Sequence, residues 1–105
     1  MVEFRAMNSE ISERSTVAAA RDQVSSDLGG EVAILNLDAG MYYGLDEVGG
    51  RIWELVQEPR VVRVIQSTIA EEYEVEPARA ERDVLALLHQ LVDEGLIEVK
   101  NESPA

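Results

Sequence analysis

Few residues of this chain belong to the types that perform acid–base, nucleophilic or metal chemistry. The sequence contains no cysteine, which excludes a thiolate nucleophile and a cysteine metal site. The one histidine, His89, falls in a stretch with helical periodicity and has no second candidate ligand at a suitable spacing. A metal site needs several such ligands. His89 is therefore interpreted as a residue on the flank of a helix.

Neighbouring carboxylates and glycines offer two further chemistries, acid–base pairs and phosphate binding. Carboxylates adjoin at 71–72 and 93–94, but acidic runs that follow apolar helical segments are usually solvated helix surface. The glycine pairs at 29–30 and 49–50 lack the spacing of a phosphate-binding loop and its Lys-Ser/Thr. We therefore expect no catalytic residues, no metal and no cofactor in this protein, which is predicted not to be an enzyme.

The net charge narrows the classes of partner. Among 105 residues, 21 are acidic and 9 are basic, so the formal net charge is −12. Binding to nucleic acid or to anionic lipid depends on Lys and Arg, so neither partner is expected. The electrostatic field of such an acidic protein favours a neutral or basic peptide as its partner, although the negative charge could equally serve solubility alone. No stretch reaches the ~18 apolar residues of a membrane span, and no apolar signal-peptide core is present. A cytoplasmic location is expected.

Length and composition predict a single globular domain. A chain of 105 residues with 46% hydrophobic residues has material for one core but not for two. The first residues are polar and without periodicity, so 1–14 is predicted to be a flexible arm. The folded domain is predicted to span 15–99, and 100–105 to be a flexible tail.

The most definite β-structure is a hairpin between 31–37 and 41–45. A three-residue loop with Gly40 in the left-handed conformation is a common closure, and it pairs Leu37 with Met41. Because side chains alternate between the faces of a strand, this register predicts which residues face the core. The predicted core face carries Ala33, Leu35, Leu37, Met41, Tyr43 and Leu45. The predicted outer face carries Val32, Ile34, Asn36, Tyr42 and Gly44.

Three helices follow the hairpin. Apolar residues with helical spacing predict helices at about 47–56 and 61–73, and a third from Pro77 to Gly95. Asp46 is the predicted N-cap of the first helix, and Gly95 is the predicted C-terminal cap of the third. The glycine pair at 49–50 disfavours a helix by about 1–2 kcal/mol, which indicates close packing against a neighbour. Trp53 is predicted to lie in the core.

A third strand is predicted at 16–20 or at 23–25, and a short closing strand at 96–99. The fold class is therefore α+β: a small winged-helix-like domain with a three-stranded antiparallel sheet followed by three helices. Winged-helix domains often bind DNA through the third helix. Here that helix and its ends are rich in acidic residues, which phosphate would repel. We therefore predict a winged-helix-like topology without DNA binding.

The second hairpin strand, Met41–Leu45, lacks the features that usually protect a sheet edge. It contains no lysine and no proline. Its backbone groups could accept an extended peptide as an added strand. The alternative interpretation, which the residues leave open, is an ordinary edge covered by the third helix or by the N-terminal arm.

Two stretches, EVAILNLDAGMYYGLDEVGGRIWELV and VVRVIQSTIAEEYEVEPARAERDVLALLHQLVDEGLIEV, resemble the PqqD-like family. The resemblance covers about 16–99 and is strongest to the stand-alone members encoded with lasso peptides. It implies a non-catalytic RiPP recognition element, a docking domain for ribosomally made, post-translationally modified peptides. In such domains the leader segment of the precursor peptide adds to the third strand and packs against the third helix. The domain then presents the precursor to a leader peptidase and, in lasso clusters, to a macrocyclase.

Carried onto this chain, the resemblance places the docking strand at 41–45, beside the helix that begins at Pro77. One flank of that helix carries Asp83, Leu87 and Leu91, and the other carries Arg82, Leu85 and His89; we favour the first flank. The predicted peptide-binding residues are Met41, Tyr42, Tyr43, Gly44, Leu45, Asp83, Leu87 and Leu91. The alternative function is an acidic structural or regulatory protein that binds a basic partner, or self-associates, through the same strand.

Overall fold

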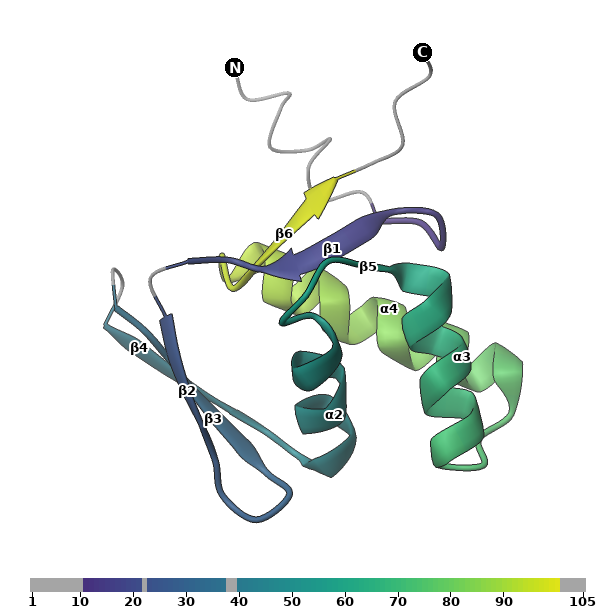
Figure 1. Cartoon of the computed structure of the whole chain (residues 1–105), viewed down its shortest axis with the longest axis horizontal. Coiled ribbons are helices and arrows are strands. Elements are labelled where there is room, and N and C mark those ends of the chain that lie inside the picture. Colours follow the sequence, from purple (N-terminus) through teal and green to yellow (C-terminus); the bar gives the residue numbers. More distant parts are fainter. Residues whose placement is uncertain (1–10, 22, 38–39, 101–105) are drawn as a thin grey trace.

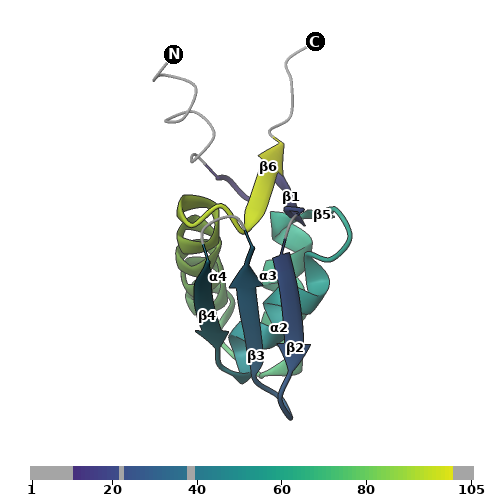
Figure 2. The ribbon, with the colours of Figure 1, turned by 90° about the vertical axis from the view of Figure 1, so that its left-hand side faces the viewer.

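The computed structural model describes residues 11–21, 23–37 and 40–100. The strands that form one sheet are β2 (Gln23–Asp27), β3 (Val32–Asn36) and β4 (Met41–Leu45), in the order β2-β3-β4 and antiparallel throughout. The helices are α2 (Glu47–Leu55), α3 (Val62–Glu72) and α4 (Pro77–Asp93), and all three lie on the same side of that sheet, with α3 beyond α2 (Figures 1 and 2). The predicted α+β fold, a three-stranded antiparallel sheet followed by three helices, is confirmed.

A second small sheet joins the two ends of the domain. It consists of β1 (Thr16–Ala19), β5 (Arg60–Val61) and β6 (Ile97–Lys100), in the order β5-β1-β6. Both predicted positions for the extra strand are therefore strands, but they belong to different sheets. The predicted closing strand is β6, and it pairs with β1 so that Val17 lies opposite Val99. This sheet lies across one end of the helical layer (Figure 1).

The predicted arm and tail lie mostly outside the described residues, which begin at 11 and end at 100. The described part of the arm packs onto the domain. Ile11 contacts the core cluster, and the Arg63 N–H donates to the carbonyl of Glu13 (2.9 Å). The packed domain therefore extends at least to Ile11.

The register predicted for the hairpin is wrong by one residue. Met41 pairs with Asn36 rather than with Leu37, and Tyr43 pairs with Ile34. Gly40 has the expected positive φ of 66°, but its N–H donates to the carbonyl of Asn36 (2.8 Å), which closes a four-residue loop instead of three. A one-residue shift turns every side chain of β3 to the opposite face.

The shift changes which β3 residues lie in the core. Val32 and Ile34 face the helices, and Ile34 is completely buried. Leu35 and Leu37, predicted to be core residues, are exposed. On β4 the alternation is as predicted for Tyr43 and Leu45, which pack against the core, and for Tyr42 and Gly44 on the other side. Met41, also predicted to be a core residue, is 50% exposed and does not pack against the core.

The helix ends follow their local signals. Asp46 is the N-cap of α2, as predicted, and its Oδ1 accepts the N–H of Gly49 (2.8 Å). Gly95, with φ of 76°, ends α4 in a Schellman motif: its N–H donates to Val92 and the N–H of Leu96 to Leu91.

One core cluster lies between the helices and the two sheets. Trp53 is 3% exposed within it, which confirms its predicted core position. The other members include residues from every helix and from β1, β3 and β6, so no second core exists among the described residues. The fully buried large side chains are Ile34, Ile52, Ile65, Leu88, Leu96, Val17, Val56, Val62 and Val84.

Gly50 is the point of close packing that the glycine pair predicted. A Cβ at this position would lie 2.9 Å from Val32 Cγ2 and 3.3 Å from the carbonyl oxygen of Gly30. We expect Gly50→Ala to lower the free energy of unfolding by about 1–2 kcal/mol, because overpacking outweighs the better helix propensity of alanine. Gly49→Ala, whose nearest contacts are 3.2 Å, should cost less. Chemical denaturation of both variants measures the difference, and a Gly50→Ala protein as stable as wild type would contradict the packing argument.

Candidate functional site

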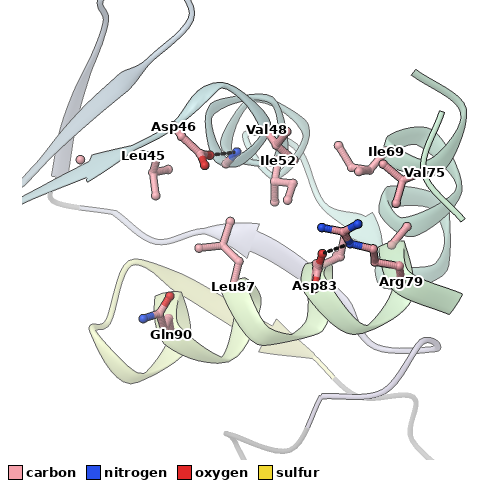
Figure 3. A pocket seen from close by; sticks show the side chains of 14 residues that line it. Leu45, Asp46, Val48, Ile52, Ile69, Val75, Arg79, Asp83, Leu87 and Gln90 are labelled. Atoms are coloured by element: carbon pink, nitrogen blue, oxygen red, sulfur yellow. Dashed lines mark hydrogen bonds and ion pairs between the residues drawn. The ribbon is translucent and has the colours of Figure 1, made fainter. Parts of the chain in front are cut away.

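A cleft of about 600 Å³ opens between the end of β4, the first turns of α2 and one flank of α4. Leu45 on the strand side faces Leu87 on α4 across it, with Val48 and Ile52 beside Leu45 (Figure 3). The lining residues are Gly44, Leu45, Asp46, Val48, Gly49, Ile52, Ile69, Val75, Arg79, Ala80, Asp83, Val84, Leu87 and Gln90. The cleft therefore has apolar walls that come from four elements of the fold.

Two of the charged residues that line the cleft lie on α4 and pair with each other. Arg79 and Asp83 form an ion pair one helical turn apart on α4, with Nε 3.6 Å from Oδ2 (Figure 3). Both side chains are about two-thirds exposed, at 68% and 64%, so the pair contributes little to stability. Both are free to rearrange when a ligand enters.

The shape of the strand side of the cleft follows from the junction between β4 and α2. The strand ends at Leu45, Asp46 caps the helix, and α2 begins at the next residue. This sharp connection places the first turn of α2 directly beside the end of β4. Gly49 allows the close approach, because a Cβ there would lie 3.2 Å from the Cβ of Leu45.

The backbone of β4 forms the open margin of the cleft. β4 is the last strand of its sheet, and no described strand pairs with its free side. A Cβ at Gly44 would have no neighbour within 4 Å, so the space beside this residue is open. Tyr42 is 68% exposed on the outer side of the strand. An unpaired strand thus lies next to an apolar cleft.

Tyr43 bridges β4 to the end of α4. Its hydroxyl donates to Glu94 Oε1 (2.8 Å), on the residue that caps α4. This hydrogen bond raises the pKa of Tyr43 above its ordinary value, with smaller contributions from burial and from the negative charge of Glu94. The bond therefore joins β4 to the end of α4 at a point outside the cleft.

The Tyr43 bridge predicts a specific alkaline titration. Because the folded-state pKa of Tyr43 is raised, the stabilisation from its neutral hydroxyl is complete below the ordinary tyrosine pKa of 10.0 and is lost as pH rises through the raised value. Subtracting the ultraviolet titration of Tyr43→Phe from that of wild type isolates this group. We expect a midpoint above 10, which falls when Glu94→Ala removes the acceptor. An unchanged midpoint in Glu94→Ala would contradict the bridge.

The structure brings half of the predicted binding residues to the cleft. Gly44 and Leu45 line it from β4, and Asp83 and Leu87 line it from α4. The opposite flank of α4, with Arg82, Leu85 and His89, does not line it.

The other predicted residues lie elsewhere. Met41 and Tyr42 lie on β4 outside the cleft, Tyr43 forms the bridge to Glu94, and Leu91 is a core residue that is 3% exposed. Contact of any of these residues with a peptide stays a prediction.

The contribution of α2 and α3 to the cleft was not predicted. Val48 and Ile52 of α2, with Ile69 of α3 and Val75 after it, form much of the apolar wall. The capping residue directly after β4 was the signal for α2, because a helix that starts there must lie beside the strand. The α3 residues gave no such signal, since their position depends on how the helices pack.

Two other features, a metal site and a membrane-spanning helix, are not found in the described part of the chain. Its His, Asp and Glu residues form no group of three or more that could hold a metal ion. Across 11–100, apart from the gaps at 22 and 38–39, no helix combines the length and apolarity needed to cross a bilayer.

Comparison with known proteins gives two matches. The family described as "Coenzyme PQQ synthesis protein D (PqqD)" matches residues 31–97, which include β3, β4 and all three helices. A solved structure described as "TbiB1 in Complex with the TbiA(beta) Leader Peptide" is 34% identical with a TM-score of 0.72. The match covers 82% of this chain and 98% of that one. No curated protein matches the chain.

Proposed function

The chain belongs to the PqqD family, and on this basis we propose that it captures the leader segment of a ribosomally made precursor peptide. One observation supports this function above the others: the unpaired edge of β4 borders an apolar cleft. The strand edge can bind the backbone of a peptide, and the cleft beside it can bind the side chains of the same peptide. The similar structure was solved with a leader peptide, which supports the same class of ligand for this chain.

In the proposed complex, the leader adds to β4 as an antiparallel fourth strand of the sheet. Its backbone pairs with the free side of β4, and alternate side chains enter the cleft toward Leu87 and Ile52. The remaining side chains lie on the outer face, level with Tyr42 and Gly44. No catalytic group is needed for this role, and we propose a binding module rather than an enzyme.

Rough magnitudes are consistent with such binding. Four backbone hydrogen bonds at ~0.5–1.5 kcal/mol each and two buried anchors at ~1.5–3 kcal/mol each give roughly 5–12 kcal/mol. Ordering a disordered leader subtracts about 2–5 kcal/mol or more. Micromolar or somewhat tighter binding is therefore expected, since ~1 μM corresponds to about −8 kcal/mol. The net charge of −12 favours a leader that is neutral or basic.

We propose further that the module presents the captured precursor to maturation enzymes: a leader peptidase and, as in lasso-peptide biosynthesis, a macrocyclase. A chain of 105 residues suits a protein that acts through others. The final product and the sequence of the leader are features of the precursor gene.

The direct test is a titration of this protein with fluorescently labelled leader peptide from the precursor encoded beside it. We expect saturable binding, and a scrambled peptide of the same composition should bind far more weakly. Absence of saturation up to high micromolar concentrations would refute the proposal. A concentration-dependent dimer that ignores the peptide, seen by light scattering, would favour the acidic structural or regulatory alternative.

A further inference from the structure

The face of the sheet that points away from the helices is apolar along one continuous row. Val24, Leu35 and Tyr42 lie directly opposite one another across β2, β3 and β4. They are 53%, 39% and 68% exposed. Figure 2 looks onto this face, with the three strands in front of the helices. The corrected register of β3 creates the row, because it turns Leu35 outward.

Among the described residues of β2, β3 and β4, none with a charged side chain lies on this face. The row beside the apolar one consists of Ser26, Ala33 and Gly44, which also pair across the three strands. In a chain with 29% charged residues, six uncharged outward positions form a distinct surface, which we call the outer face. The solvated side of an antiparallel sheet normally carries polar residues. Contiguous exposed apolar surface is typical of a protein interaction site.

Charge argues against a second copy as the occupant of the outer face. Each copy carries a net charge of −12, and the exposed acids Asp27 and Glu31 lie at the β2–β3 end of the sheet. Two such faces would bring like charges together around an apolar centre, which disfavours association. A different protein, with an apolar patch set among basic residues, fits this surface better.

The position of the outer face indicates which partner would gain from it. The apolar row ends at Tyr42 on β4, the strand to which the leader is proposed to add. Outward side chains of the leader would continue the row, so a protein seated here would contact the module and the leader together. We propose that the outer face docks the leader peptidase, which thereby recognises the loaded module. This inference rests on the proposed function.

The test compares two valines of similar exposure. Val24 on the outer face is 53% exposed, and Val64 is 49% exposed on α3, the helix that lies on the side of the molecule away from the sheet in Figure 1. Each is changed to Glu and to Lys, and two affinities are measured: that of labelled leader peptide for the module, and that of the peptidase encoded with the precursor for the loaded module. Val24 lies on the strand farthest from β4, so its substitution should leave the leader affinity within about threefold.

We expect both Val24→Glu and Val24→Lys to weaken peptidase binding at least tenfold, and both Val64 variants to leave it unchanged. Loss with either charge marks an apolar contact rather than a charge effect. Retained peptidase binding in the Val24 variants, or no binding to the loaded wild type, overturns the inference. A wild-type dimer that Val24→Glu dissociates also overturns it, in favour of a second copy. Failure of the leader to bind the wild type is a separate result, which refutes the proposed function itself.

Discussion

Gly44→Pro is expected to abolish binding of the leader peptide while the domain stays folded. Proline removes the backbone N–H at this position and places a ring beside the strand, and edge strands tolerate proline better than central ones do. An added strand would then lose its continuous pairing along β4, an array worth roughly 2–6 kcal/mol. The expected loss of affinity is therefore about 30-fold or more. Fluorescence anisotropy with labelled leader measures it.

Gly44→Ala is the matched control for this substitution. It keeps the N–H, and its Cβ meets nothing within 4 Å, so affinity for the leader should change little. Thermal unfolding of both variants shows whether the β3–β4 pairing survives. If a folded Gly44→Pro protein bound the leader as tightly as wild type, strand addition at β4 would be wrong.

A leader peptide with single N-methylated residues tests the same contact from the other side. In an antiparallel pair, alternate residues of the added strand turn their N–H groups toward β4. N-methylation at those residues should weaken binding strongly, and at the residues between them only slightly. A uniform response along the peptide would indicate recognition by side chains without strand pairing.

The features that were predicted from the sequence are those with local causes. Asp46 at an N-cap, Gly95 at a helix end and the apolar periodicity of the three helices each act within a few residues. The second sheet has no local cause of this kind. Its central strand β1 pairs with β6, about 80 residues later in the sequence, and β5 has only two residues. The sheet therefore depends on segments that meet only in the folded domain.

The register of β3 was predicted wrongly although the alternation of its residues is regular. The run from Val32 to Leu37 is apolar on both faces apart from Asn36, so alternation alone could not decide which face is buried. The loop decided it, through the hydrogen bond from Gly40 to Asn36. The consequence is functional as well as structural: the hairpin is apolar on both faces because one face fills the core and the other forms the outer face.

The cleft was only half predictable for a related reason. The family resemblance located β4 and the Asp83–Leu87 flank of α4, since both belong to continuous stretches of sequence. The wall formed by Ile52 and Ile69 depends on how three helices pack, which no single stretch encodes. The choice between the two flanks of α4 therefore depends on which one lines the cleft. Substitution of one leucine on each flank, Leu87 and Leu85, tests that choice.

Leu87→Ala is expected to weaken leader binding by about 10- to 150-fold, whereas Leu85→Ala should change it less than threefold. Both leucines are on α4 and partly buried against the core, so both substitutions should lower stability to a similar extent. Only Leu87 lines the cleft, where a leader side chain would bury it and gain ~1.5–3 kcal/mol from the contact. Titration of labelled leader against both variants, with chemical denaturation as the folding control, separates binding from stability. Equal losses in the two variants would attribute the effect to the fold, and a loss confined to Leu85→Ala would place the leader on the flank with Arg82 and His89.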